Sequence, residues 1–107
     1  MLQPDVLFVS SARLLRAPEA GFLEVVPDLV GEVRSKRDSW PSVIQKGCIW
    51  IEHGVKVVWL VDPEDRSVTT MRPNMPPETA GIAGSFTGAP VLPELTIPVK
   101  LLFKGLV

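Results

Sequence analysis

The sequence contains little cysteine, little histidine and no excess of charge of either sign. Cys48 is the single cysteine, so the chain can form neither an intramolecular disulfide nor a cysteine-based metal site. A lone thiol fits a reducing, cytoplasmic location. His53 is the single histidine, and its place at an expected helix end favours a surface role over metal binding. The 11 basic and 12 acidic residues give a net charge of −1, so composition does not support a nucleic-acid partner.

Long apolar runs are also missing. Residues 57–61 form one of the longest, and they have the length of a strand, not the roughly 20 residues that a membrane-spanning helix needs. No basic and apolar leader follows Met1, so we expect neither a signal peptide nor a membrane partner. The composition, with 46% hydrophobic and 21% charged residues, indicates a globular domain with a core.

The length predicts one domain over residues 1–107. A domain of this size buries only about 60–70% of its unfolded-chain surface, so its stability is marginal. We therefore expect association with further copies of the chain, as a homo-oligomer.

Two strands are expected in the first third of the chain. The first covers residues 6–9, and a short helical piece follows Ser10. The second covers residues 28–35. The period-2 rule places Leu29, Gly31 and Val33 on one face of that strand. The opposite face is predicted to carry Asp28, Val30, Glu32 and Arg34, and it is either exposed to solvent or part of a polar site.

The pattern predicts the main helix over residues 40–53. Ser39 suits the N-cap, Pro41 suits the first turn and Gly54 suits the position after the last turn. Gly47 is expected to allow close packing against a sheet. The apolar residues at helical spacing are Trp40, Val43, Ile44, Cys48 and Ile51, so Cys48 is expected to be a buried, inert thiol.

The second half of the chain predicts a hairpin and then irregular structure. Strands over residues 55–61 and 67–72 flank a turn over residues 62–66, and the preceding strand and helix complete a βαβ pattern. Five prolines and three glycines between residues 73 and 93 exclude long regular elements there, with short strands near Ile82 and Val91. A last short helix is expected over residues 98–104. The predicted fold class is therefore α/β, with a mixed sheet and one main helix packed on it.

Five polar residues carry the candidate chemistry. Two carboxylates and a backbone carbonyl suffice to hold Mg²⁺, and a nearby cation can orient water or offset developing charge. On spacing alone, however, a solvated strand face is favoured over a metal site. For the basic cluster of Arg34, Lys36 and Arg37, a solvated loop is likewise favoured over a phosphate-binding patch. The candidate residues are Asp5, Asp28, Glu32, Arg34 and Lys46.

Several successive segments resemble the Uma2 (DUF820) family, whose members have the restriction-endonuclease-like fold of the PD-(D/E)XK nuclease superfamily. The resemblance spans nearly the whole chain, and its most specific part runs from Gly54 to the Asp-Pro that ends the next strand. The matching segments are Pro4-Asp5-Val6, residues 27–33, Lys46 four positions before Trp50, Gly54-Val55, residues 58–63, and residues 92–103.

The resemblance implies a Mg²⁺- or Mn²⁺-dependent endonuclease that acts on DNA. Asp5 and Glu32 match the two acids of the motif, and the carbonyl of Val33 would be the third protein ligand. Arg34 stands where the motif has its basic residue. Lys46 matches the lysine that many relatives carry on the following helix. Asp28 matches a recurrent acid at the start of the strand, for which a supporting or capping role and metal ligation are equal alternatives.

Two departures from the family pattern are visible. Relatives usually carry a long portion before the first acid, so we expect an N-terminally truncated core. Arginine stays charged and is a poorer proton-transfer group than lysine. A shortened, non-catalytic relative that acts as an interaction or assembly module is therefore the alternative expectation, and a gene fragment without a role of its own is the third.

Overall fold

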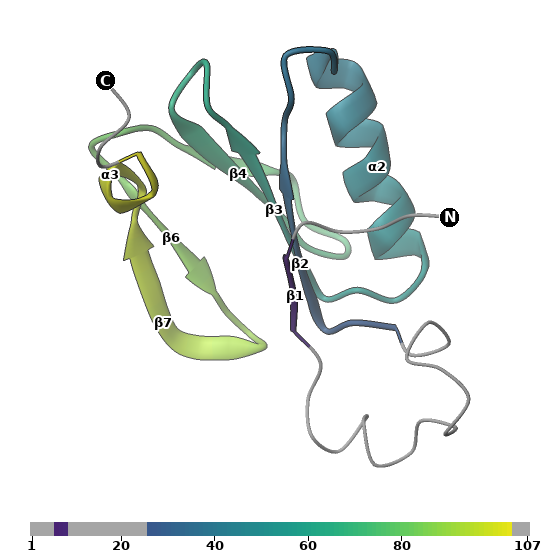
Figure 1. Ribbon diagram of the computed structural model, residues 1–107. Helices are drawn as coiled ribbons and strands as arrows, with labels where there is room; N and C mark the ends of the chain where they lie inside the picture. The colour runs from purple at the N-terminus through teal and green to yellow at the C-terminus, as the bar shows by residue number, and fades with distance from the viewer. Residues whose placement is uncertain (1–5, 9–25, 104–107) are drawn as a thin grey trace.

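The computed structural model describes residues 6–8 and 26–103 (Figure 1). The expected strand over residues 6–9 is confirmed for Val6–Phe8, while Val9, the helical piece after Ser10 and Asp5 lie outside the described residues. The described strands are Val6–Phe8 (β1), Leu29–Val33 (β2), Val57–Asp62 (β3), Ser67–Met71 (β4), Glu78–Ala80 (β5), Ser85–Gly88 (β6) and Leu92–Pro98 (β7). The described helices are Trp40–Glu52 (α2) and Val99–Leu102 (α3).

Five strands form a mixed sheet in the order β1-β2-β3-β4-β5. β2 and β3 are parallel and are connected through α2, and the other neighbours in the sheet are antiparallel. The βαβ unit and the β3–β4 hairpin expected from the sequence are therefore confirmed. β6 and β7 form a second, two-stranded sheet. β7 begins next to Val91, where a short strand was expected, whereas Ile82 lies in a turn and the strand β6 was not predicted.

Helix α2 has the ends that its sequence predicts. The Ser39 hydroxyl accepts a hydrogen bond from the backbone N–H of Ser42 at 3.3 Å, and Gly54 ends the helix with φ +105°. A Cβ at Gly47 would lie 2.6 Å from the sulfur of Met71, so this glycine allows the close approach to the sheet. The buried residues of the helix are Val43, Gly47 and Trp50.

The expectation of a buried Cys48 was wrong, because its thiol is exposed. Successive helix residues are about 100° apart, so Cys48 points well away from the sheet-facing direction of Gly47. Residues along the flank of a helix recur at the same sequence spacing as residues at its buried centre. The apolar pattern therefore included Cys48, although its side chain does not face the sheet.

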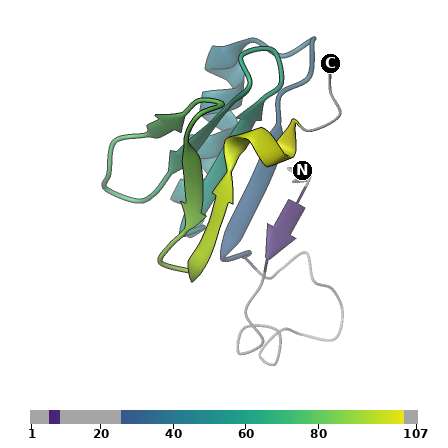
Figure 2. The ribbon, with the colours of Figure 1, turned by 90° about the vertical axis from the view of Figure 1, so that its left-hand side faces the viewer.

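The main sheet is covered on both faces, which gives three layers (Figures 1 and 2). On one face α2 closes an apolar cluster that includes Val30 and Leu60. On the other face the β6–β7 sheet and α3 close a second cluster around Val68 and Phe86. Trp59 joins these layers, because its ring meets Phe86 edge-on at 5.0 Å and its indole N–H donates to the carbonyl of Thr87 at 3.0 Å.

β2 is buried over most of its length, which bears on the interpretation of its polar face as exposed to solvent. Leu29, Val30, Gly31 and Glu32 are all buried, and Val33 at the end is 49% exposed. The solvent-facing interpretation is therefore wrong for Glu32, which is 7% exposed. Because α2 packs over the face of β2 that carries Val30 and Glu32, polar alternation does not identify an exposed face here.

Candidate active site

Glu32 lies near the carboxyl end of β2. Its backbone is opposite Leu60 of β3, and it follows Val30 by two residues, so its side chain shares the face on which Val30 packs beneath α2. A carboxylate in such a place has lost most of its water, and burial of this kind requires compensating polar contacts. The sequence therefore places one acid in an interior position at the end of a strand.

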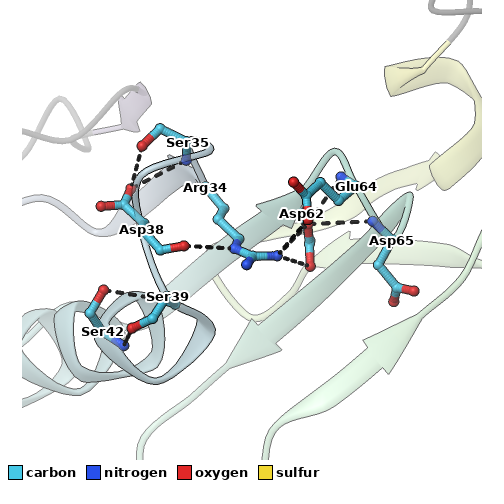
Figure 3. A network of polar contacts seen from close by, with 8 residues as sticks. All are labelled: Arg34, Ser35, Asp38, Ser39, Ser42, Asp62, Glu64 and Asp65. Atoms are coloured by element: carbon cyan, nitrogen blue, oxygen red, sulfur yellow. Dashed lines mark hydrogen bonds and ion pairs between the residues drawn. The ribbon is translucent and has the colours of Figure 1, made fainter.

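Arg34 lies just beyond Glu32, where β2 leaves the sheet (Figure 3). Its Nη1 donates to both carboxylate oxygens of Asp62, at 3.2 and 3.3 Å, and lies 3.6 Å from the carboxylate of Glu64. Its Nε donates to the carbonyl of Asp38 at 3.1 Å. The guanidinium thus joins the end of β3 and the loop that leads into α2.

Asp62 is the acceptor at the centre of this network. Its Oδ1 also accepts the backbone N–H groups of Glu64 at 3.1 Å and of Asp65 at 3.4 Å, so it closes the turn between β3 and β4. Its side chain is only 10% exposed. The sequence interpretation assigned Asp62 to a turn and missed its ion pair with Arg34, because the two residues are 28 positions apart.

Asp38 closes the β2–α2 loop from the other side. Its carboxylate accepts the backbone N–H of Ser35 at 3.2 Å and the hydroxyl of Ser35 at 2.9 Å. These two hydrogen bonds lower the pKa of Asp38 below its usual 3.8, and the positive charges of Lys46 and Arg34 lower it further.

Lys46 lies in the middle of α2 and is exposed. Its charge acts on Asp38, so the ammonium is within electrostatic range of the loop that follows β2. The helix that carries Lys46 begins directly after the loop that Arg34 contacts.

Asp28 lies at the opposite end of β2 from Glu32. The two residues are four positions apart, which is about 13 Å along a strand. The carbonyl of Asp28 accepts the backbone N–H groups of Lys56 at 3.0 Å and Val57 at 3.3 Å, which ties the start of β2 to the start of β3.

Asp5 lies outside the described residues, but the neighbouring pairing is clear. Val6, which follows Asp5 in the sequence, pairs with Gly31, which precedes Glu32. Among the described residues, no group of three or more His, Cys, Asp or Glu side chains is placed to hold a metal ion. An expected site that includes Asp5 falls outside that search.

An apolar cavity of about 300 Å³ borders the same end of β2. Glu32 and Val33 line it together with Trp59, Val61 and Phe103. Lys36 and Arg37, the rest of the basic cluster, are exposed on the loop beyond the strand. In the part of the chain that the structure describes, no helix has the length and apolar character needed to cross a membrane.

The chain is similar to proteins of one family. A family model described as "Uma2: Putative restriction endonuclease" matches residues 1–100. A solved structure from Anabaena variabilis, described as a "putative nuclease belonging to DUF820", is 28% identical with a TM-score of 0.66. The match covers 77% of this chain and 46% of that chain, so the present chain corresponds to less than half of its relative. No curated protein matches the sequence. The structural match, together with the mixed sheet and the one main helix of the described residues, confirms the expected fold class.

Proposed function

Because the chain belongs to the Uma2 family, we propose that it is a metal-dependent endonuclease that hydrolyses phosphodiester bonds of DNA. The active site in this proposal lies at the carboxyl end of β2. Asp5, Glu32 and the backbone carbonyl of Val33 bind the cation, and Lys46 assists the reaction.

The pairing of β1 with β2 is the observation that carries this proposal. Val6 is opposite Gly31 in an antiparallel ladder, and opposite residues of such a ladder have their side chains on the same face. In the proposal the ladder continues by one residue, so that the carboxylates of Asp5 and Glu32 lie side by side. Both would then face the side of the sheet on which α2 packs.

The donor set fits a divalent cation of the hard class. Two carboxylates and one carbonyl offer only oxygen, which suits Mg²⁺ or Mn²⁺ better than zinc or copper. The burial of Glu32 at a strand end supports its assignment as one of these oxygen donors. When bound, the cation would lower the pKa of a water and stabilise charge on the phosphate.

Lys46 is the residue that we assign to proton transfer or charge compensation. Its ammonium is exposed on a flexible stem, and lysine is a better proton-transfer group than arginine. Asp28 is assigned a supporting role, because its carbonyl joins β2 to β3 at the end away from Glu32.

Self-association is part of the same proposal. Val33 and Leu102 are exposed by 49% and 40%, and both line the apolar cavity beside Glu32. Exposed apolar surface favours contact with another protein surface. Multi-angle light scattering tests this point, and a monomer at high micromolar concentration would contradict it.

Nicking of supercoiled plasmid in Mg²⁺ or Mn²⁺ tests the proposed activity. We expect Glu32→Gln and Asp5→Asn to lower the rate by about 100-fold or more, because each removes a charged ligand. Glu94→Gln is the matched control, since Glu94 is an exposed acid on β7. Equal residual nicking by the wild type and Glu32→Gln would refute the proposal and indicate a contaminating nuclease.

Calorimetric titration with Mn²⁺ provides an assay that does not depend on the DNA substrate. The wild type and Glu94→Gln should bind the ion, and Glu32→Gln should bind it at least 10-fold more weakly. A stable oligomer without metal binding would favour the alternative, a non-catalytic assembly module.

A further inference from the structure

Three segments converge on the guanidinium of Arg34 (Figure 3). Arg34 belongs to the chain that leaves β2, and its backbone N–H still donates to the carbonyl of Val61 on β3 at 2.8 Å. Its side chain then reaches Asp62 at the end of β3 and the carbonyl of Asp38 in the β2–α2 loop. Nη1 and Nε are therefore both engaged within the protein.

The partners of Arg34 are themselves held in place. Asp62 is fixed by the backbone N–H groups of the β3–β4 turn, and Asp38 is fixed by two hydrogen bonds from Ser35. The side chains of Arg34 and Asp62 are 22% and 10% exposed, so water competes only weakly for these contacts.

We propose that Arg34 and Asp62 act as positioning residues that hold Glu32 and Lys46 in their reactive places, and that Arg34 does not act on the phosphate. This inference rests on the function proposed above. Glu32 is two residues before Arg34 on β2. Lys46 is on the helix that begins directly after the Ser35–Asp38 loop. The contacts of Arg34 with Asp62 and Asp38, called the clamp below, therefore fix both elements.

The chemistry of arginine explains why this position carries arginine and not lysine. A planar guanidinium can donate in two directions at once, to a carboxylate and to a carbonyl. A lysine ammonium is a point charge on a flexible stem, and it would hold one partner and release the other. A displacement of about 1 Å in a catalytic group can lower a rate by about 100-fold.

The decisive experiment compares the single-turnover nicking rates of Arg34→Lys, Asp62→Asn and the double variant in Mn²⁺. The positioning role predicts about a 10-fold or larger loss in each single variant, and a double variant no slower than the slower single one. Lys36→Met, an exposed neighbour in the same loop, is the control and should keep the wild-type rate. If position 34 instead acted chemically, Arg34→Lys would keep or raise the rate, and this result would overturn the proposal.

The rates must be measured at a temperature at which circular dichroism shows every variant fully folded. A role in stability alone would lower the melting temperature but leave the rate of the folded protein unchanged, and that outcome also overturns the proposal. The pH dependence of the rate gives a second readout. It should keep its midpoint in Arg34→Lys, because position 34 exchanges no proton in the reaction, and a shifted midpoint would contradict this.

Amide hydrogen exchange separates failure of the clamp from failure of the nuclease proposal. Asp62→Asn should speed exchange at Ser35 and Asp38, whose N–H groups close the loop, and Lys36→Met should not. Unchanged exchange in Asp62→Asn would refute the clamp whether or not the protein cleaves DNA. If exchange were faster in Asp62→Asn but the wild type and Glu32→Gln nicked DNA equally, the clamp would be supported as a structural contact and its role in catalysis would be refuted.

Discussion

Replacing Gly47 with alanine tests how closely α2 approaches the sheet. The added Cβ would lie 2.6 Å from the sulfur of Met71 and 3.3 Å from Cδ1 of Leu60, and both of these residues are buried. Met71 or the whole helix must therefore move. Since α2 also carries Lys46, the close approach at Gly47 helps to set the position of a candidate site residue.

Two opposing terms decide the size of the effect. Alanine is favoured over glycine in a helix interior by about 0.5–1 kcal/mol. Overpacking a well-packed core costs about 1–3 kcal/mol. The overlap with a buried thioether makes the second term the larger one, so we expect Gly47→Ala to lower the free energy of unfolding by about 1 kcal/mol. For a domain of this size, that corresponds to a decrease in Tm of about 4–8 °C.

Urea denaturation followed by circular dichroism measures this change, and a second substitution identifies its cause. In a Met71→Ala background the obstructing sulfur is absent, so Gly47→Ala should be neutral or stabilising there. Gly81→Ala is the matched control, because no atom lies within 4 Å of its added Cβ. If Gly47→Ala raised the stability of the otherwise unchanged protein by about 1 kcal/mol, helix propensity alone would account for it and the close contact would be refuted.

The remaining predictions concern Asp38, Cys48 and Gly54. Carbon-detected NMR titration should give Asp38 a pKa below 3.8, because Ser35 hydrogen-bonds its charged form, and Lys46→Met should raise that pKa. A carboxyl whose pKa is lowered in the folded state stabilises the fold at pH values above its unfolded pKa. This stabilisation is lost as the pH falls through the folded pKa. The free energy of unfolding of Asp38→Asn should therefore change less with pH below about 4 than that of the wild type. Cys48 should react with a maleimide in the folded protein nearly as fast as a free thiol, and protection until unfolding would contradict its exposure. Gly54→Ala should destabilise the protein by about 1 kcal/mol or more in a thermal melt, because φ +105° is unfavourable for alanine, and an unchanged Tm would argue against this backbone conformation.

The ends of α2 were predictable because their signals are local. Ser39, Pro41 and Gly54 act within one helical turn of their own positions, and each occupies the place that the sequence assigned to it. The β3–β4 hairpin was predictable for the same reason, since its turn residues separate two apolar segments directly.

The burial of side chains was predicted less well, because it depends on what covers each element. Cys48 shares the spacing of the apolar face of α2 but lies outside its buried centre. Glu32 alternates with apolar residues as an exposed position would, yet it is buried, because α2 packs over the face of β2 that carries Val30 and Glu32. A strand was expected near Val91, where β7 begins, but the pairing of β6 with β7 was not predicted, because a pairing depends on the whole register and not on local signals.

For the candidate site, the sequence by itself supplied the acidic and basic residues. The family resemblance assigned each of them to a position of the family's motif. The tertiary structure decided which of them meet. It paired Val6 with Gly31 beside Glu32 and joined Arg34 to Asp62, although in each pair the partners are distant in sequence. Local signals determine helices and turns, because residues that are close in sequence interact at every stage of folding. An ion pair between two strand ends forms only after the sheet has assembled in one register.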